Sequence, residues 1–319
     1  PYAAPPVGEL RWKAPQPPAS WTGVRKCDTF GDPCIQPLRP KGGFYEREFY
    51  RHSFHAYPPP WSEDCLYLNI WTPAQKADEK LPVMVWIHGG GFTQGYGHEP
   101  RYDGDGIARK GVILVSINYR LTIFGFFGHP ELTQESGTCG NYAIQDQIAA
   151  LRWVHENIAA FGGDPENITM FGQSAGAMSV QAVAASPLSK GLVRRAIAQS
   201  GAGLTAPQSR HDRAFLEERG LKFMEAVGAK NLAELRAIPG QKLMDLAVEQ
   251  KVSNFGAFPV IADGVTLPLD PGTAFAQGKQ LDIDYLVGST ILETQIMPRF
   301  DQDGVTKENF GQKLTGKMG

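Results

Sequence analysis

The chain has 319 residues, of which 42% are hydrophobic and 20% charged, a composition typical of a globular protein with a sizeable buried core. Its formal net charge of −2 gives no reason to expect nucleic acid or an anionic membrane as a partner. No uninterrupted apolar run reaches the roughly 18 residues that a transmembrane helix needs.

Several short apolar runs predict strands. Residues 1–60 are rich in proline, glycine and aromatic residues and predict loops with short edge strands, whereas alternating apolar residues over 64–71 predict a regular strand. Continuous apolar runs are typical of strands buried on both faces of a parallel sheet. We predict buried strands of this kind at 81–87, 112–119 and 167–172. A fourth strand is predicted at 196–200 and a late strand at 283–289.

Helical segments separate these strands. Apolar residues recur at helical spacing over 142–160, small residues continue from Ser174 to about Ala185, and 208–250 is helical with charged faces. Strands that alternate with helices predict the α/β class, with a mostly parallel central sheet flanked by helices. We expect a single catalytic domain over 1–319.

The pattern Gly172-x-Ser174-x-Gly176 lies between a predicted buried strand and a predicted helix. A serine on such a sharp turn leaves the usual backbone conformations, and flanking glycines remove Cβ clashes. The turn would lift the hydroxyl above the sheet edge, where the following helix directs its N-terminal N–H groups. This context predicts a nucleophile; the alternative is an ordinary glycine-rich turn with a capping serine.

Three glycines, Gly89-Gly90-Gly91, follow the predicted strand 81–87 after a single residue, His88. Acyl transfer places negative charge on a substrate oxygen, and preorganised backbone N–H groups stabilise that charge. We expect these glycines, with the N–H of Ala175 after the nucleophile, to form an oxyanion hole. The alternative is a flexible glycine loop without a ligand.

The four cysteines form no C-x-x-C pair, which argues against a zinc or redox site. We predict neither a metal nor a cofactor. Spacing alone leaves two possibilities open, one or two disulfides or four reduced thiols in a cytosolic enzyme.

Three segments together resemble the type-B carboxylesterases, the group that includes cholinesterases and bacterial para-nitrobenzyl-type esterases. They are S-E-D-C-L-Y-L-N-I-W (62–71), W-I-H-G-G-G-F (86–92) and F-G-G-D-P-E-N-I-T-M-F-G-Q-S-A-G (161–176). The resemblance implies an α/β-hydrolase fold. It also implies hydrolysis of small-molecule carboxylic esters through a Ser-His-Glu triad and an acyl-enzyme intermediate.

The resemblance assigns roles to individual residues. Ser174 is the expected nucleophile, and Glu293, after the late strand, is the expected triad acid. Ser200 matches a second serine that supports the acid. The expected oxyanion donors are Gly90, Gly91 and Ala175.

The triad histidine of this family follows the acid, but none of the seven histidines here follows Glu293. We therefore expect the base to lie beyond Gly319 and the 319-residue piece alone to be inactive. Pro1 is not a start of translation and the final G-K-M-G completes no element, so we expect a fragment that is incomplete at both ends. His88 belongs to the glycine loop and would brace it. Gln173, a neutral residue before the nucleophile, disfavours choline esters, because a cation site needs a negative or π-rich wall.

The resemblance also implies a Cys34–Cys65 disulfide, which closes a loop of about 31 residues and stabilises by roughly 3–4 kcal/mol in the chain-entropy model. Cys27 and Cys139 then remain as free thiols. Localisation is left open, with a secreted or periplasmic location favoured.

One alternative to an enzyme is a non-catalytic, cholinesterase-like protein-interaction domain. The same family includes members that lost the nucleophile, but this chain retains Ser174, the glycine loop and Glu293. A further alternative is an amidase or acyltransferase that uses the same residues. The sequence does not specify the oligomeric state.

Overall fold

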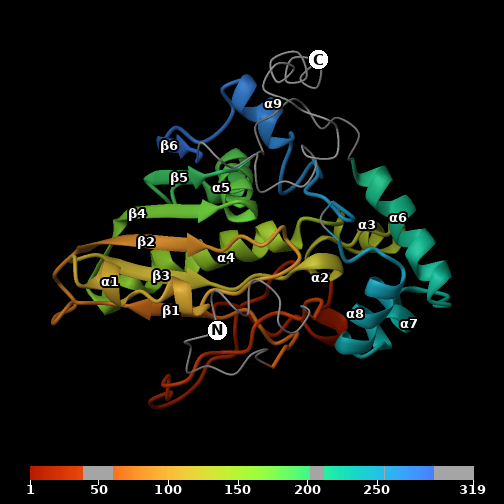
Figure 1. Ribbon diagram of the computed structural model, residues 1–319, viewed down its shortest axis with the longest axis horizontal. Coiled ribbons are helices and arrows are strands. Elements are labelled where there is room, and N and C mark those ends of the chain that lie inside the picture. The colour runs from red at the N-terminus through yellow and green to blue at the C-terminus, as the bar shows by residue number, and fades with distance from the viewer. Residues whose placement is uncertain (39–59, 202–211, 255, 291–319) are drawn as a thin grey trace, which may run out of the picture.

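The computed structural model describes residues 1–38, 60–201, 212–254 and 256–290. These residues form a six-stranded sheet with the strand order β1-β3-β2-β4-β5-β6 (Figure 1). β1 runs antiparallel to β3, and all other neighbours are parallel, which confirms the mostly parallel sheet predicted from the sequence. The strands are β1 (Leu68–Trp71), β2 (Leu81–Ile87), β3 (Ile113–Ile117), β4 (Gly163–Gln173), β5 (Arg195–Gln199) and β6 (Asp284–Gly288).

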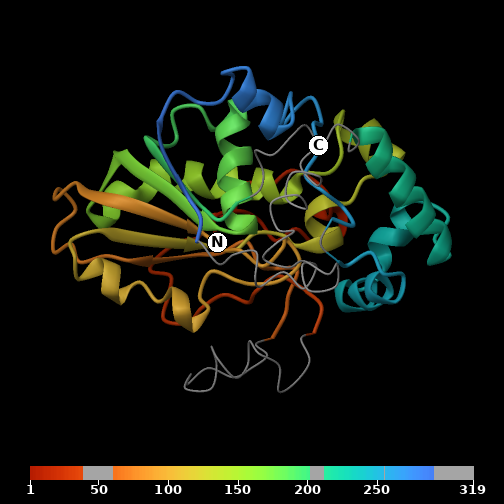
Figure 2. The ribbon, with the colours of Figure 1, turned by 45° about the horizontal axis from the view of Figure 1, so that its top comes forward.

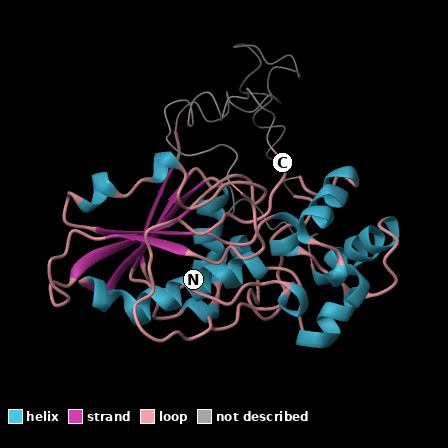
Figure 3. Ribbon diagram, turned by 90° about the horizontal axis from the view of Figure 1, so that it is seen from below, coloured by secondary structure: helices cyan, strands magenta, loops and turns pink. Residues whose placement is uncertain are grey.

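Helices cover both faces of this sheet (Figures 1 and 3). α4 and α5 contact each other and β4, whereas the short α1 packs on β3 from the opposite face (Figure 2). The segment predicted as helical over 208–250 contains α6, α7 and α8, which gather at one end of the molecule. The helices are α1 (Asp105–Ala108), α2 (Thr122–Phe126), α3 (Pro130–Ser136), α4 (Tyr142–Asn157), α5 (Ala175–Ala185), α6 (Arg213–Ala226), α7 (Leu232–Ala237), α8 (Gly240–Glu249) and α9 (Pro271–Ala276).

Burial differs among the predicted central strands. Every residue of β3 is buried, as expected for a strand covered on both faces. In β4 burial alternates, with Ile168 and Met170 buried and Thr169 and Phe171 half-buried. The prediction of complete burial was therefore wrong for β4, because the four-residue α1 packs on β3 and leaves the same face of β4 less well covered. It was also wrong for the first half of β2, where Pro82 is exposed and Met84 is half-buried.

A buried ion pair joins the end of β3 to α4. Arg120 donates from Nε and Nη2 to the two carboxylate oxygens of Asp146 at 2.8 and 2.7 Å, and both side chains are almost fully buried. Arg120 Nη1 also donates to the backbone oxygen of Lys13 at 2.9 Å. A two-pronged guanidinium contact is geometrically specific, so this pair sets the position of α4 relative to the sheet and the N-terminal segment.

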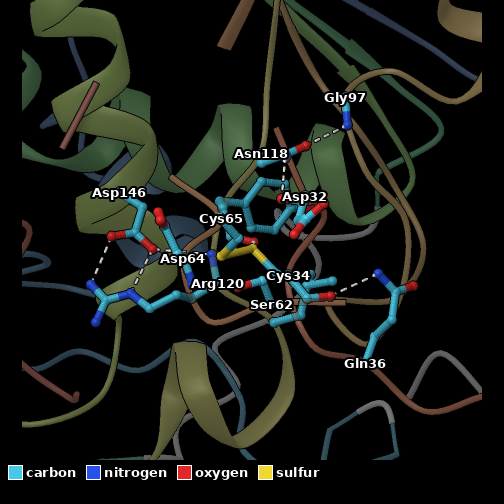
Figure 4. Close-up of a disulfide and its surroundings, with 12 residues drawn as sticks. Asp32, Cys34, Gln36, Ser62, Asp64, Cys65, Gly97, Asn118, Arg120 and Asp146 are labelled. Atoms are coloured by element: carbon cyan, nitrogen blue, oxygen red, sulfur yellow. Dashed lines mark hydrogen bonds and ion pairs between the residues drawn. A yellow bond between two sulfur atoms is a disulfide. The ribbon is translucent and has the colours of Figure 1, made fainter. Parts of the chain in front are cut away.

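The predicted Cys34–Cys65 disulfide is present, with the two Cα atoms 4.9 Å apart. It lies close to the Arg120–Asp146 pair and to Asn118, which follows β3 (Figure 4). The bridge therefore ties the irregular N-terminal segment to the chain that enters β1.

Cys27 and Cys139 are free thiols, as predicted. Cys27 is exposed, whereas Cys139 is completely buried, and burial raises the pKa of the Cys139 thiol. In the described ranges, no helix combines the length and the apolar character that crossing a bilayer requires.

This difference predicts the outcome of a thiol titration. In the native protein about one thiol per chain, that of Cys27, should react with a disulfide reagent, because the reagent must reach the thiolate. In denaturant without reductant about two should react, because unfolding also exposes Cys139 while Cys34 and Cys65 stay bonded to each other. A Cys27→Ser variant should remove the native signal and leave the denatured signal from Cys139. Rapid native labelling of Cys139, or four reactive thiols without reductant, would contradict the assignment.

Candidate active site

The carboxyl ends of β2, β4, β5 and β6 meet at one edge of the sheet. Ile87 pairs with Gly172, Gln173 pairs with Gln199, and Gln199 pairs with Gly288. The segments that follow these strands therefore start beside one another. The glycine loop follows β2 at this edge, and Ser174 follows β4. Ligands of open α/β sheets bind at the carboxyl ends of the strands, which is the same kind of edge.

Ser174 lies on the turn between β4 and α5 with φ 56° and ψ −123°, a conformation that non-glycine residues rarely adopt. Its N–H donates to the backbone oxygen of Gln199 at 2.9 Å, and its carbonyl accepts from Met178 N–H at 3.0 Å. These two hydrogen bonds hold the turn between β5 and the first turn of α5. Because Ser174 is only half-buried, its side chain is not sealed in the core.

The flanking glycines allow the turn to approach β2. A Cβ at Gly176 would collide with the backbone oxygen of Ile87, and one at Gly172 would collide with the backbone of Gly176. The close approach brings the glycine loop next to the serine. A Cβ built at Gly89 would lie 3.3 Å from the Cβ of Ser174.

The glycine loop turns sharply after β2. Gly90 and Gly91 have φ values of 110° and 66°, and the carbonyl of Gly90 accepts from the N–H groups of Thr93 and Gln94 at 3.2 Å each. Within the described ranges, no protein acceptor takes the N–H of Gly90, Gly91 or Ala175. Ala175 is the first residue of α5, where helix geometry leaves the N–H without an intrahelical partner.

Two pockets flank this loop. A polar pocket of about 400 Å³ is lined by Gly89, Gly90, Gly91, Thr93, Gln94, Arg101, Tyr102, Gln173 and Ser174. A smaller, more apolar pocket of about 120 Å³ shares Gly91 and Thr93 with it and includes Phe126, Met178, Val252, Phe258 and Val260. An ester whose carbonyl oxygen reached the loop amides could direct its two substituents to opposite sides.

His88 lies behind the loop and does not line either pocket. Its Nδ1 is 2.8 Å from the carbonyl of Gly89, and its ring stacks on Tyr119 with centroids 4.3 Å apart. Tyr119 donates its hydroxyl to the carbonyl of His88 at 2.7 Å. Burial raises the pKa of Tyr119 well above its usual range, so this hydroxyl keeps its proton at neutral pH.

Ser200 follows β5 at the same sheet edge, with φ 56° and its N–H donating to Gly288 at 2.7 Å. Glu293 lies outside the described residues, so its role as triad acid stays a prediction. The roles of Ser174, Ser200, Gln173, His88 and the oxyanion donors are likewise predictions, for which the geometry above provides support. Across the described part of the chain, no group of acidic, histidine or cysteine side chains is arranged to hold a metal ion.

Sequence reasoning missed a clamp on the far side of the glycine loop. The buried Gln36 accepts from Gly95 N–H at 2.9 Å and donates to the Gly95 carbonyl at 3.1 Å. A further hydrogen bond joins Gly97 N–H to the side-chain oxygen of Asn118 at 2.8 Å (Figure 4). Gln36 lies two positions after Cys34, so the disulfide and this clamp hold the same segment against the loop.

We expect Gln36→Leu to loosen the glycine loop. The substitution leaves a buried N–H and a buried carbonyl of Gly95 without partners, which costs about 1–3 kcal/mol. Denaturant unfolding should show this loss, and hydrogen exchange should accelerate in peptides that cover 88–97.

Gln16→Leu is the matched control, because Gln16 is exposed and its side chain donates only to the nearby carbonyl of Ala14. It should change neither stability nor exchange in the loop. Unchanged exchange over 88–97 in Gln36→Leu would show that the clamp does not restrain the loop.

Comparisons with known proteins agree with this geometry. A family model described as the carboxylesterase family matches residues 1–316. The chain is 40% identical over 290 residues to the fumonisin B1 esterase of Sphingopyxis macrogoltabida, covering 90% of this chain and 51% of that protein. It is 39% identical over 328 residues to the para-nitrobenzyl esterase of Bacillus subtilis (strain 168), covering 100% of this chain and 63% of that protein.

Solved structures give the same result. A PNB esterase structure matches with a TM-score of 0.79 and 37% identity, covering 97% of this chain and 62% of that one. A Geobacillus stearothermophilus carboxylesterase matches with a TM-score of 0.79 and 36% identity, covering 100% and 63% of the two chains. These matches confirm the α/β-hydrolase fold predicted from the sequence. The chain spans between about half and two-thirds of the length of these relatives.

Proposed function

The chain belongs to the carboxylesterase family, and on this premise we propose that it carries the nucleophile and the oxyanion hole of a serine carboxylic-ester hydrolase. One observation carries the proposal. Ser174, in a strained backbone conformation, lines the same pocket as the loop Gly89-Gly90-Gly91. The proposed substrates are small-molecule esters.

In the proposed reaction, the Ser174 hydroxyl oxygen attacks the ester carbonyl carbon and gives up its proton to a histidine. The carbonyl oxygen takes the negative charge and accepts hydrogen bonds from the N–H groups of Gly90, Gly91 and Ala175. Collapse of this intermediate breaks the bond to the alkoxy group, which leaves as an alcohol with the proton from the histidine. Water then attacks the acyl-enzyme by the same steps and releases the acid.

The geometry supplies the electrostatic part of this chemistry. Each preorganised oxyanion donor is worth about 2.7–4 kcal/mol of transition-state stabilisation. The N-terminus of the 11-residue α5 adds its positive dipole end at the same point. The amides cost little to reorganise, because the hydrogen bonds around Gly90, Gly95 and Ser174 already hold the backbone in place.

The proposed base and its orienting acid come from outside the described residues. Glu293 would orient the histidine and stabilise its charged form. None of the seven histidines in the 319 residues follows Glu293, so by this proposal the 319-residue chain alone turns over esters at or near background. A non-catalytic interaction domain is a weaker candidate, because such a role requires neither the strained Ser174 nor the glycine amides beside it.

The protein expressed from its full reading frame should react with a fluorophosphonate probe at Ser174. Ser174→Ala should abolish labelling and lower kcat for 4-nitrophenyl esters by roughly 10⁶, the loss seen when such a nucleophile is removed. Peptide mass spectrometry locates the label. The exposed Ser20 offers a matched control, and Ser20→Ala should retain both labelling and turnover. Equal labelling of Ser174→Ala would overturn the proposed function.

A further inference from the structure

We propose that Arg101 gives the pocket around Ser174 a preference for esters that carry a carboxylate on one of their two substituents. This inference rests on the proposed function and specifies its substrate class. Arg101 lies in the short 3₁₀ helix Pro100–Tyr102 and lines the polar pocket together with Ser174. Among the described residues that line this pocket, Arg101 has the only charged side chain.

Within the described ranges, Arg101 forms an ion pair with a carboxylate that lies away from the pocket. Arg101 Nη2 contacts Glu99 Oε2 at 2.8 Å, and the side chain of Glu99 is completely buried, whereas 27% of the Arg101 side chain is exposed. Glu99 does not line the pocket. Of these two residues, only Arg101 is therefore placed to meet a bound molecule. A planar guanidinium has five N–H donors and can contact a second carboxylate while it keeps the partners it already has.

Aromatic packing joins Arg101 to the strands that carry the reactive groups. The Arg101 guanidinium carbon lies 4.6 Å from the ring centroid of Tyr102. Tyr102 packs on Trp86 of β2 with centroids 4.9 Å apart, and Trp86 packs on Phe171 of β4 at 4.8 Å. Phe171 precedes Ser174 by three positions, so the arginine is supported on the same framework as the nucleophile and pays little side-chain entropy on binding.

The other described residues that line this pocket carry no negative charge. Gln173, the residue before the nucleophile, contributes a neutral amide, and the rest of this described lining is glycine, threonine, glutamine, tyrosine and serine. The smaller pocket beyond Gly91 is mainly apolar. The two pockets together fit an ester with one apolar substituent and one that ends in a carboxylate.

Two matched pairs of esters test this preference on the protein expressed from its full reading frame. The first pair places the charge on the acyl group (4-nitrophenyl hemisuccinate against 4-nitrophenyl butyrate). The second places it on the alcohol (3-acetoxypropionate against propyl acetate). The quantity to compare is the ratio of kcat/KM for the anionic ester to that for the neutral ester. In at least one pair, Arg101→Gln should lower this ratio about ten-fold or more, because the loss of a charge-assisted hydrogen bond has an effect of this size.

Arg101→Gln alone removes one cation from the buried carboxylate of Glu99, and breaking one side of a buried ion pair destabilises proteins strongly. The double variant Glu99→Gln/Arg101→Gln removes both charges and should show the same fall in the ratio. Arg101→Lys keeps the charge and should retain part of the preference. Arg109→Gln is the matched control, because Arg109 is exposed, pairs with Asp105 at 2.8 Å and lies outside the pocket, so its ratio should stay at the starting value.

The unmodified protein provides a test that does not depend on folding of the variants. Added salt should lower kcat/KM for the anionic ester relative to its neutral partner. The inference is wrong if the ratio of kcat/KM for the anionic to the neutral ester stays unchanged in both Arg101→Gln and Glu99→Gln/Arg101→Gln. If neither variant folds, a ratio in the unmodified protein that does not respond to salt has the same meaning. Ser174-dependent turnover of the neutral esters would then leave the proposed function intact. If the unmodified protein cleaves none of the four esters, the proposed function fails, and the inference falls with it.

Discussion

The site depends on one close approach between backbones. β4 turns into α5 so near to the end of β2 that the positions of Gly172 and Gly176 have no room for a Cβ atom. This contact places Ser174 beside the glycines that follow β2, and the parallel register of β2 and β4 aligns the two turns. A side chain at either glycine would separate the hydroxyl from the amides, and the proposed reaction needs both groups at the same place.

Support for this contact comes from residues that are distant in sequence. Tyr119 donates to the carbonyl at the start of the glycine loop, and Gln36 clamps the backbone at its end. The disulfide holds the segment that carries Gln36. Residues 1–38, which contain only the short 3₁₀ helix Gly8–Leu10, therefore stabilise the loop on which the proposed oxyanion hole depends.

Charge divides the space around the nucleophile. The wall that contains Arg101 is polar and carries a cation whose counterion is buried, whereas the wall beyond Gly91 is mainly apolar. Such an asymmetry would orient an ester before any chemistry takes place. It also agrees with the expectation, based on Gln173, that choline esters are poor substrates, because a fixed cation repels another.

The sequence alone was sufficient to predict the strands of the sheet, the serine turn, the glycine loop and, through the family resemblance, the Cys34–Cys65 bridge. These features depend on short patterns, since short apolar runs favour buried strands and glycines that follow such runs favour turns. Only the tertiary structure decided that β1 runs antiparallel, that β4 is less well covered on one face, that Gln36 binds the end of the glycine loop, and that Arg101 lines the pocket of Ser174. Gln36 and Gly95 are 59 positions apart in the sequence. The proposed role of Arg101 depends on the burial of its partner Glu99, while the arginine itself stays partly exposed. Such properties arise from long-range packing, in which the partner of a residue is determined by the fold and not by its neighbours along the chain.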